Sequence, residues 1–123
     1  MSLTERLTGM SLRDNAPIVL VGMGHGATHW IAATFYLLLP ALSTTLGLDY
    51  AATGLLVSVL HVAAFVANFG SGAVTDMTGR RVLLQVTSLV VGAGALALLG
   101  TSGGLLALVA LVAVIGITNN LWH

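Results

Sequence analysis

The side chains best able to carry chemistry in this 123-residue chain are histidines surrounded by apolar residues. His25 and His29 are four residues apart, so on a helix they share one face, and Tyr36 continues that stripe. Because imidazole titrates near neutral pH, such a strip could line a cavity that binds a solute or passes protons. Hydrogen bonds from these histidines to neighbouring helices are the alternative. No zinc site is expected, since two histidines lack a third ligand and the glutamate of an H-E-x-x-H motif.

Three more polar residues interrupt apolar stretches and are further candidates to line a cavity. His61 lies near the middle of one stretch, Asn68 follows it on the same helical face, and Asn119 lies near the end of another. A hydrogen bond between helices, worth on the order of 1 kcal/mol in a membrane, would also account for His61. Capping of a helix end would account for Asn119.

The sequence predicts neither an enzyme nor a nucleic-acid-binding protein. It contains no Ser/His/Asp set, no paired carboxylates and no phosphate-binding loop, and Asp49 and Asp76 fall in different predicted loops. Neither a cofactor nor a metal ion is expected. Lysine and arginine together number 4 and the net charge is zero, so there is no basic patch for a nucleic acid.

The composition indicates a membrane protein. Hydrophobic residues make up 57% of the chain and charged residues 7%, whereas about a quarter of a soluble domain is charged. Residues 15–48, 50–75 and 82–123 contain no charged side chain. A membrane-spanning helix needs about 20 apolar residues, so the first two stretches hold one span each, and the third, interrupted by glycines at 100–104, holds two. We therefore predict an all-α membrane protein with four transmembrane helices.

Local signals place the boundaries of these helices. We expect an N-terminal segment at residues 1–14 and a membrane domain at 15–123, with spans at about 17–39, 51–73, 82–99 and 105–121. Asn15 is expected to cap the first helix and Pro17 to lie in its first turn. Pro40 is expected to mark the end of this helix, and Asp49 to cap the second.

All four arginines fall on one side of this arrangement. Arg6 and Arg13 precede the first span, Arg80 and Arg81 lie between the second and third, and the other two loops contain no lysine or arginine. By the positive-inside rule, the arginine-bearing side faces the cytoplasm. The N-terminus is therefore expected in the cytoplasm.

The segment between the second and third predicted spans carries a distinctive motif. Gly72, Asp76, Gly79, Arg80 and Arg81 fit the pattern G-x-x-x-D-x-x-G-R-R. This stretch resembles the cytoplasmic loop between the second and third helices of the major facilitator superfamily. The resemblance implies a gating loop that helps to hold the inward-closed state. Its aspartate would meet a helix of the C-terminal half, and its arginines would form nearby ion pairs.

A second, weaker resemblance lies in the first predicted span. Gly24 and His25, followed by the residues from Leu37 to Pro40, are similar to the first helix of fosmidomycin-resistance-like members of the same superfamily. This resemblance implies a bacterial inner membrane. Those members often carry Asn-Asp shortly after the histidine, where this chain has Thr28 and His29.

These resemblances imply a function and a larger architecture. Major facilitator proteins are secondary transporters with twelve spans in two halves of six. The chain is therefore expected to be the four-helix, N-terminal portion of a transporter for a small organic solute, with proton-coupled efflux as one form of this transport. Its expected partners are the lipid bilayer, an unspecified small-molecule substrate, and the missing C-terminal helices or a full-length relative.

Three other interpretations share the same four helices. The chain could be a four-span regulatory or assembly protein, a self-sufficient oligomeric carrier or channel, or a non-functional truncation product. Small four-span multidrug exporters are disfavoured because they depend on a glutamate in the first membrane helix. The first predicted span contains no glutamate.

Overall fold

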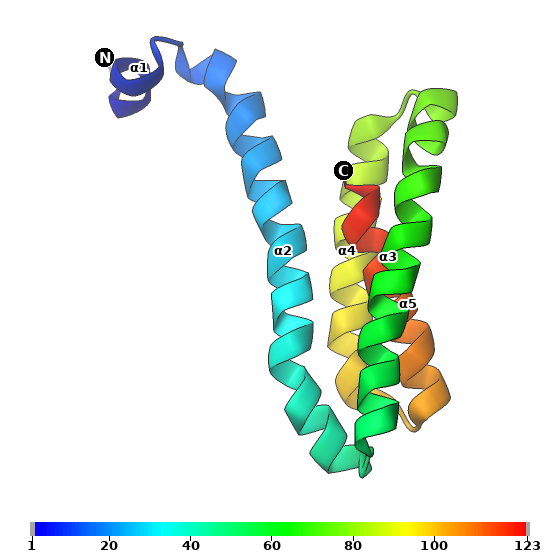
Figure 1. Cartoon of the computed structure of the whole chain (residues 1–123). Helices are drawn as coiled ribbons and strands as arrows, with labels where there is room; N and C mark the ends of the chain where they lie inside the picture. Colours follow the sequence, from blue (N-terminus) through cyan, green and yellow to red (C-terminus); the bar gives the residue numbers. More distant parts are fainter. Residues whose placement is uncertain (1, 123) are drawn as a thin grey trace.

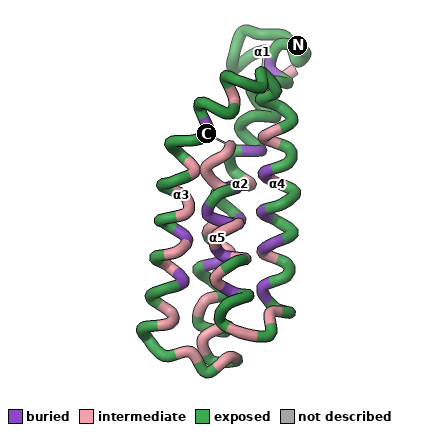
Figure 2. The backbone as a smooth tube through the Cα atoms, turned by 90° about the vertical axis from the view of Figure 1, so that its right-hand side faces the viewer, coloured by how far each residue is buried: buried purple, intermediate pink, exposed green. Residues whose placement is uncertain are grey.

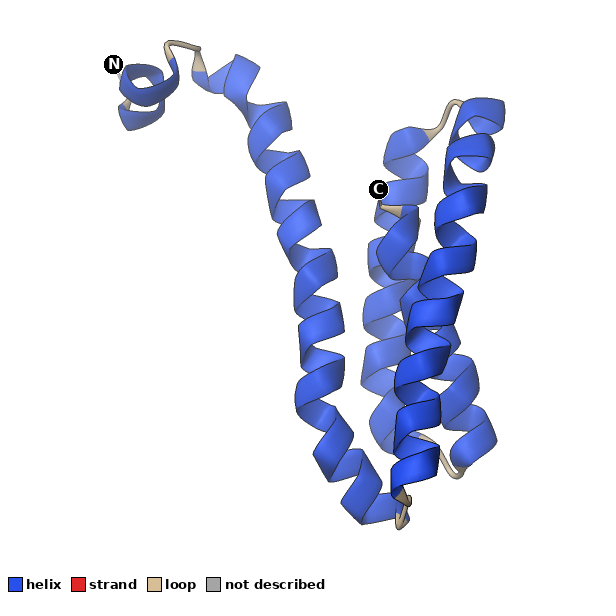
Figure 3. Cartoon of the chain, viewed as in Figure 1, coloured by secondary structure: helices blue, strands red, loops and turns tan. Residues whose placement is uncertain are grey.

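The computed structural model describes residues 2–122, so His123, the last residue of the expected membrane domain, lies outside them. In chain order the elements are α1 (Leu3–Thr8), α2 (Leu12–Leu46), α3 (Tyr50–Thr78), α4 (Arg81–Leu98), the 3₁₀ turn η1 (Leu99–Thr101) and α5 (Leu105–Leu121). No residue from 2 to 122 lies in a strand (Figure 3). The prediction of an all-helical protein is confirmed.

Three of these helices are long and apolar enough to cross a membrane: α2, α3, and α4 together with its 3₁₀ extension to Thr101. They indicate a protein embedded in a membrane. The fourth apolar helix, α5, has 17 residues and is shorter. At 1.5 Å per residue it is about 25 Å long, against a hydrocarbon core of about 30 Å. A membrane crossing by α5 stays a prediction.

The ends of α2 differ from the expected ones. The helix begins at Leu12, because the Ser11 hydroxyl accepts a hydrogen bond from the backbone N–H of Asp14 and caps it. Asn15, the expected cap, lies inside the helix. Its side-chain amide donates to Thr8 Oγ1 at 2.9 Å and to the Met10 carbonyl at 3.0 Å, which fastens α1 to the start of α2.

Proline does not end α2 either. The helix continues through Pro40 to Leu46, where Gly47 terminates it with a φ of 62°. A proline inside a helix removes one backbone hydrogen bond, a loss that long membrane helices tolerate. The far end of this helix therefore lies seven residues beyond the expected end at residue 39. Asp49 caps α3 as predicted, and its carboxylate accepts from the N–H of Ala52 at 2.7 Å.

The central helix of the bundle is α5, which packs against both α3 and α4, while α2 lies against α4 and α5. Figure 1 shows α2 joined to α3 at one end of the molecule and diverging from it toward the N-terminus. In Figure 2, much of α1 and of the N-terminal part of α2 is exposed. The buried apolar residues are Ile31, Phe35, Leu56, Leu60, Ala95, Leu99, Leu108, Val112 and Ile115.

Small residues allow the close approach of α5 to its neighbours. A side chain at Gly116 would overlap the carbonyl oxygen of Leu60 and lie 3.1 Å from the Cβ of Ala63, both on α3. On the other side, a side chain at Gly92 of α4 would lie 2.7 Å from Thr118 Oγ1. Glycine contacts of this kind bring membrane helices together through van der Waals packing.

Candidate functional site

The two histidines of α2 form a hydrogen-bonded pair. The Nε2 atoms of His25 and His29 are 3.1 Å apart, and the rings meet edge to face with centroids 4.7 Å apart. In a hydrogen bond between two ring nitrogens, one nitrogen carries the proton and the other accepts it. Each ring can therefore serve as the donor or as the acceptor in this pair.

Tyr36 connects this stripe to α3. Its hydroxyl oxygen lies 2.8 Å from Nε2 of His61, which makes a hydrogen bond between α2 and α3. Nearer the turn that joins the two helices, the hydroxyl groups of Ser43 and Thr53 form a second such bond at 2.9 Å. Polar contacts therefore link α3 to the part of α2 from Tyr36 onward.

The neighbouring stripe of α2 is the packed one. Gly24, Thr28, Ile31 and Phe35 follow each other at helical spacing and are buried. The indole of Trp122, at the end of α5, occupies the space beside Gly24, where a side chain would overlap it. His25 and His29 lie next to this stripe and are exposed, so they belong to the open side of α2.

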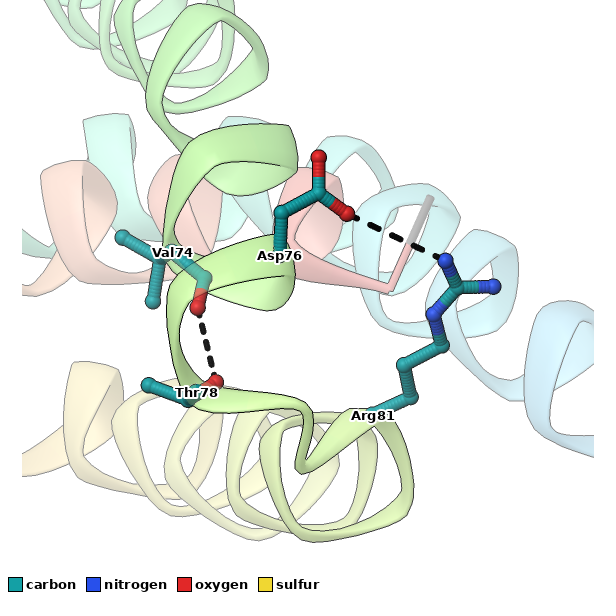
Figure 4. A network of polar contacts seen from close by, with 4 residues as sticks. All are labelled: Val74, Asp76, Thr78 and Arg81. Carbon is teal, nitrogen blue, oxygen red and sulfur yellow. Dashed lines mark hydrogen bonds and ion pairs between the residues drawn. The ribbon is translucent and has the colours of Figure 1, made fainter.

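Two charged residues of the predicted gating loop, Asp76 and Arg81, meet at the turn between α3 and α4. Figure 4 shows the Asp76 carboxylate and the Arg81 guanidinium pointing toward one another, 4.0 Å apart. Their side chains are 79% and 75% exposed. Exposed pairs of this length contribute about 0–1 kcal/mol to stability, so this one leaves both groups able to bind something else. Gly79 forms the turn with a φ of 63°.

A pocket of about 320 Å³ lies beside this ion pair, between α3, α4 and the end of α5. Its lining residues are Asn68, Ser71, Gly72, Thr75, Asp76, Arg81, Leu84, Gln85, Leu121 and Trp122. The structure thus brings together Asn68, Gly72, Asp76 and Arg81 from the residues chosen in the sequence. It places Gly79 and Arg80 on a shallower surface next to the pocket.

Several pocket residues were not predicted from the sequence. Ser71 and Thr75 follow Asn68 at spacings of three and seven residues, so a polar stripe on one face of α3 could have identified them. Gln85 and Trp122 come from α4 and from the end of α5. Only the packing of the helices places them at the same pocket.

Asn119 does not line this pocket, but its side chain has an unusual environment. Its Oδ1 atom is buried and has no hydrogen-bond partner within residues 2–122. Leaving a buried acceptor unpaired costs about 1–3 kcal/mol. A water molecule or another donor at this position would remove that cost.

No group of three or more histidine, cysteine or acidic side chains that could hold a metal ion occurs in the described part of the chain. Comparison of the chain with family models, curated proteins and solved structures gives no match. The functional argument therefore rests on the geometry of the helices and on the sequence patterns described above.

Proposed function

We propose that this chain is the N-terminal, four-helix part of a secondary transporter of the major facilitator type. In this proposal the whole transporter moves a small organic solute across a bacterial inner membrane, and this chain contributes its N-terminal part, with the N-terminus in the cytoplasm and α5 as the fourth span. The observation that carries the proposal is the polar row formed by His25, His29 and Tyr36 on α2 and by His61 on α3.

The position of this row supports a solute pathway. Polar side chains within a membrane are costly and usually face the interior of a bundle or a water-filled cavity. His29 lies near the middle of α2 and His61 near the middle of α3, and both are exposed within this chain. A cavity would form if further helices covered the open side of α2 and α3, as the twelve-span architecture implies.

The histidine pair supports coupling of this transport to protons. The pair would line the cavity with ring nitrogens that can each donate or accept a hydrogen bond. Asp76 and Arg81 supply the gating element in this proposal, because their weak ion pair at the turn leaves them able to exchange partners. Asn68 and Asn119 are further candidates to contact the solute.

Cysteine labelling tests whether the polar row faces water. The chain has no cysteine, so His29→Cys introduces a single reactive thiol. Trp30→Cys is the matched control, because residue 30 is 75% exposed but lies about 100° further around the helix. In membranes, with the remaining helices of the transporter present, we expect a water-soluble maleimide to label His29→Cys much faster than Trp30→Cys. Equal and slow labelling at both positions would refute a water-filled pathway beside α2.

The regulatory or assembly function remains as the second candidate. It is favoured by large apolar side chains of α2, such as Met23, Trp30 and Leu37, that the chain itself leaves uncovered. Solute flux through liposomes would support the transporter. Co-purification with a larger membrane protein, without flux from the pair beyond that of the larger protein alone, would support the assembly function.

A further inference from the structure

The pocket beside the α3–α4 turn combines both signs of charge with polar and aromatic walls. Asp76 and Arg81 stand at one side of it, while Asn68, Ser71, Thr75 and Gln85 supply amide and hydroxyl groups. Trp122 and two leucines supply apolar surface. A pocket with one carboxylate and one guanidinium has no net charge of its own. A ligand with a single charge would pair with only one of the two groups and would bring its charge close to the other group, which has the same sign.

The ion pair between Asp76 and Arg81 is long, so both groups remain available to a ligand. Its N···O distance of 4.0 Å exceeds the roughly 2.7–2.9 Å of a strong charge-assisted hydrogen bond. A carboxylate placed against Arg81 could accept two parallel hydrogen bonds from the guanidinium. An ammonium placed against Asp76 could donate to its carboxylate at the same time.

Ser71 and Gly72 give the pocket a hydrogen-bond acceptor and open space for a small polar molecule. Ser71 is buried, and its hydroxyl donates to the Asn68 carbonyl at 3.1 Å, so its oxygen is left to accept a hydrogen bond. Apart from the neighbouring backbone of α3, no atom lies within 4 Å of the position that a Cβ at Gly72 would occupy. The volume of about 320 Å³ is at the small end of the range of roughly 300–1,000 Å³ typical of ligand pockets.

We propose that this pocket binds a small zwitterion of the α-amino acid type. The ligand's carboxylate pairs with Arg81, its ammonium pairs with Asp76, and its side chain lies toward Trp122. This inference goes beyond the proposed function, because the pocket lies at Asp76 and Arg81 and not beside the polar row of α2 and α3. Binding itself requires no transport.

Trp122 gives the site a second property. Its indole lines the pocket and also occupies the space beside Gly24 of α2. A ligand against Trp122 therefore touches the residue that holds the end of α5 to α2. This arrangement also supplies a reporter, because the chain has only two tryptophans, Trp30 and Trp122.

The test measures binding of L-glutamine to the full chain in detergent micelles by equilibrium dialysis of the radiolabelled amino acid. In a Trp30→Phe chain, the fluorescence of Trp122 is followed during the same titration. We expect saturable binding accompanied by a change in Trp122 fluorescence. Propionate and methylamine, which each carry one charge, are expected to compete at least about tenfold more weakly, because each loses one charge-assisted contact.

Variants locate the site. Asp76→Asn and Arg81→Gln are each expected to weaken L-glutamine binding about 10- to 100-fold. Asp49→Asn and Arg13→Gln make the same chemical changes away from the pocket and are expected to bind as the parent chain does. Far-UV circular dichroism checks that all four variants keep their helices.

Other outcomes overturn the inference. The proposed site would be refuted if the folded chain showed no saturable binding, or if the control variants weakened L-glutamine binding as much as Asp76→Asn and Arg81→Gln do. Propionate binding as tightly as L-glutamine would overturn the zwitterion and leave an anion site at Arg81. L-glutamine binding by this chain, together with no flux in liposomes when its remaining helices are present, would leave this site standing and count against the transporter. Flux of another solute without L-glutamine binding would support the transporter and refute this site.

Discussion

Gly116 shows how one missing side chain sets the distance between two helices. A Cβ at this position would overlap the backbone carbonyl oxygen of Leu60 and lie 3.2 Å from the backbone nitrogen of Ala64. Backbone atoms cannot swing aside as a flexible side chain can. Gly116→Ala must therefore push α3 and α5 apart.

We expect Gly116→Ala to lower the free energy of unfolding in micelles by about 1–3 kcal/mol, the usual cost of overpacking. Gly94→Ala on α4 is the control, because nothing lies within 4 Å of its added Cβ. It should leave stability unchanged or raise it by up to about 1 kcal/mol, since alanine favours a helix. Titration with a denaturing detergent, followed by circular dichroism, compares them. A stable Gly116→Ala chain would contradict the packing of α3 on α5.

Among the residues chosen for chemistry, the histidines illustrate what spacing alone can predict. The pairing of His25 with His29 follows from the helical repeat, because both contribute to one face of α2. The partnership of Tyr36 with His61 does not, since it depends on how α2 and α3 approach each other. Spacing along one helix cannot predict a contact between two helices.

At the scale of whole elements, α3 depends on a cap that the sequence predicts correctly. Asp49 accepts a hydrogen bond from the N–H of Ala52, one of the amides that has no partner within the helix. Asp49→Ala should destabilise the chain by about 1 kcal/mol, whereas Asp49→Asn should cost much less because asparagine caps as well. Hydrogen exchange of the first amides of α3 measures this effect. Equal exchange in both variants would show that the cap is dispensable.

The length of α2 exposes the limit of such local signals. Considered one residue at a time, proline and asparagine predict a helix boundary. Pro40 and Asn15 nevertheless both lie inside α2. Ser11 provides a better cap than Asn15, and Gly47 provides the left-handed residue that ends the helix. Where local signals compete, the helix continues past the weaker signal, because each further turn adds backbone hydrogen bonds.

At the scale of the whole molecule, one contact joins the first long helix to the end of the last. Gly24→Val would place a branched side chain where the Trp122 ring lies. Because this ring belongs to the end of α5, it can move away without unfolding the bundle. In a Trp30→Phe chain, we expect the fluorescence of Trp122 to shift to longer wavelength in Gly24→Val. Gly22→Val, which meets no atom within 4 Å, should leave the spectrum unchanged.

The path of the whole chain through the membrane can be measured with single cysteines. The proposed orientation predicts that Thr78→Cys reacts with a membrane-impermeant reagent only from the cytoplasmic side. Ser102→Cys should react only from the opposite side. Asn120→Cys decides whether α5 crosses the membrane, because it should then be labelled from the same side as Thr78→Cys. Labelling of Asn120→Cys from the side of Ser102→Cys would exclude the fourth span.

The sequence by itself determined that this protein is helical, with segments apolar enough to lie in a membrane, because composition and helical repeat are properties of each segment alone. It also determined the cap at Asp49 and the shared face of His25 and His29. Only the tertiary structure decided which helix is central and which polar residues meet at one pocket. That outcome depends on the close approach allowed by glycines such as Gly116, which fixes how α5 sits against α3.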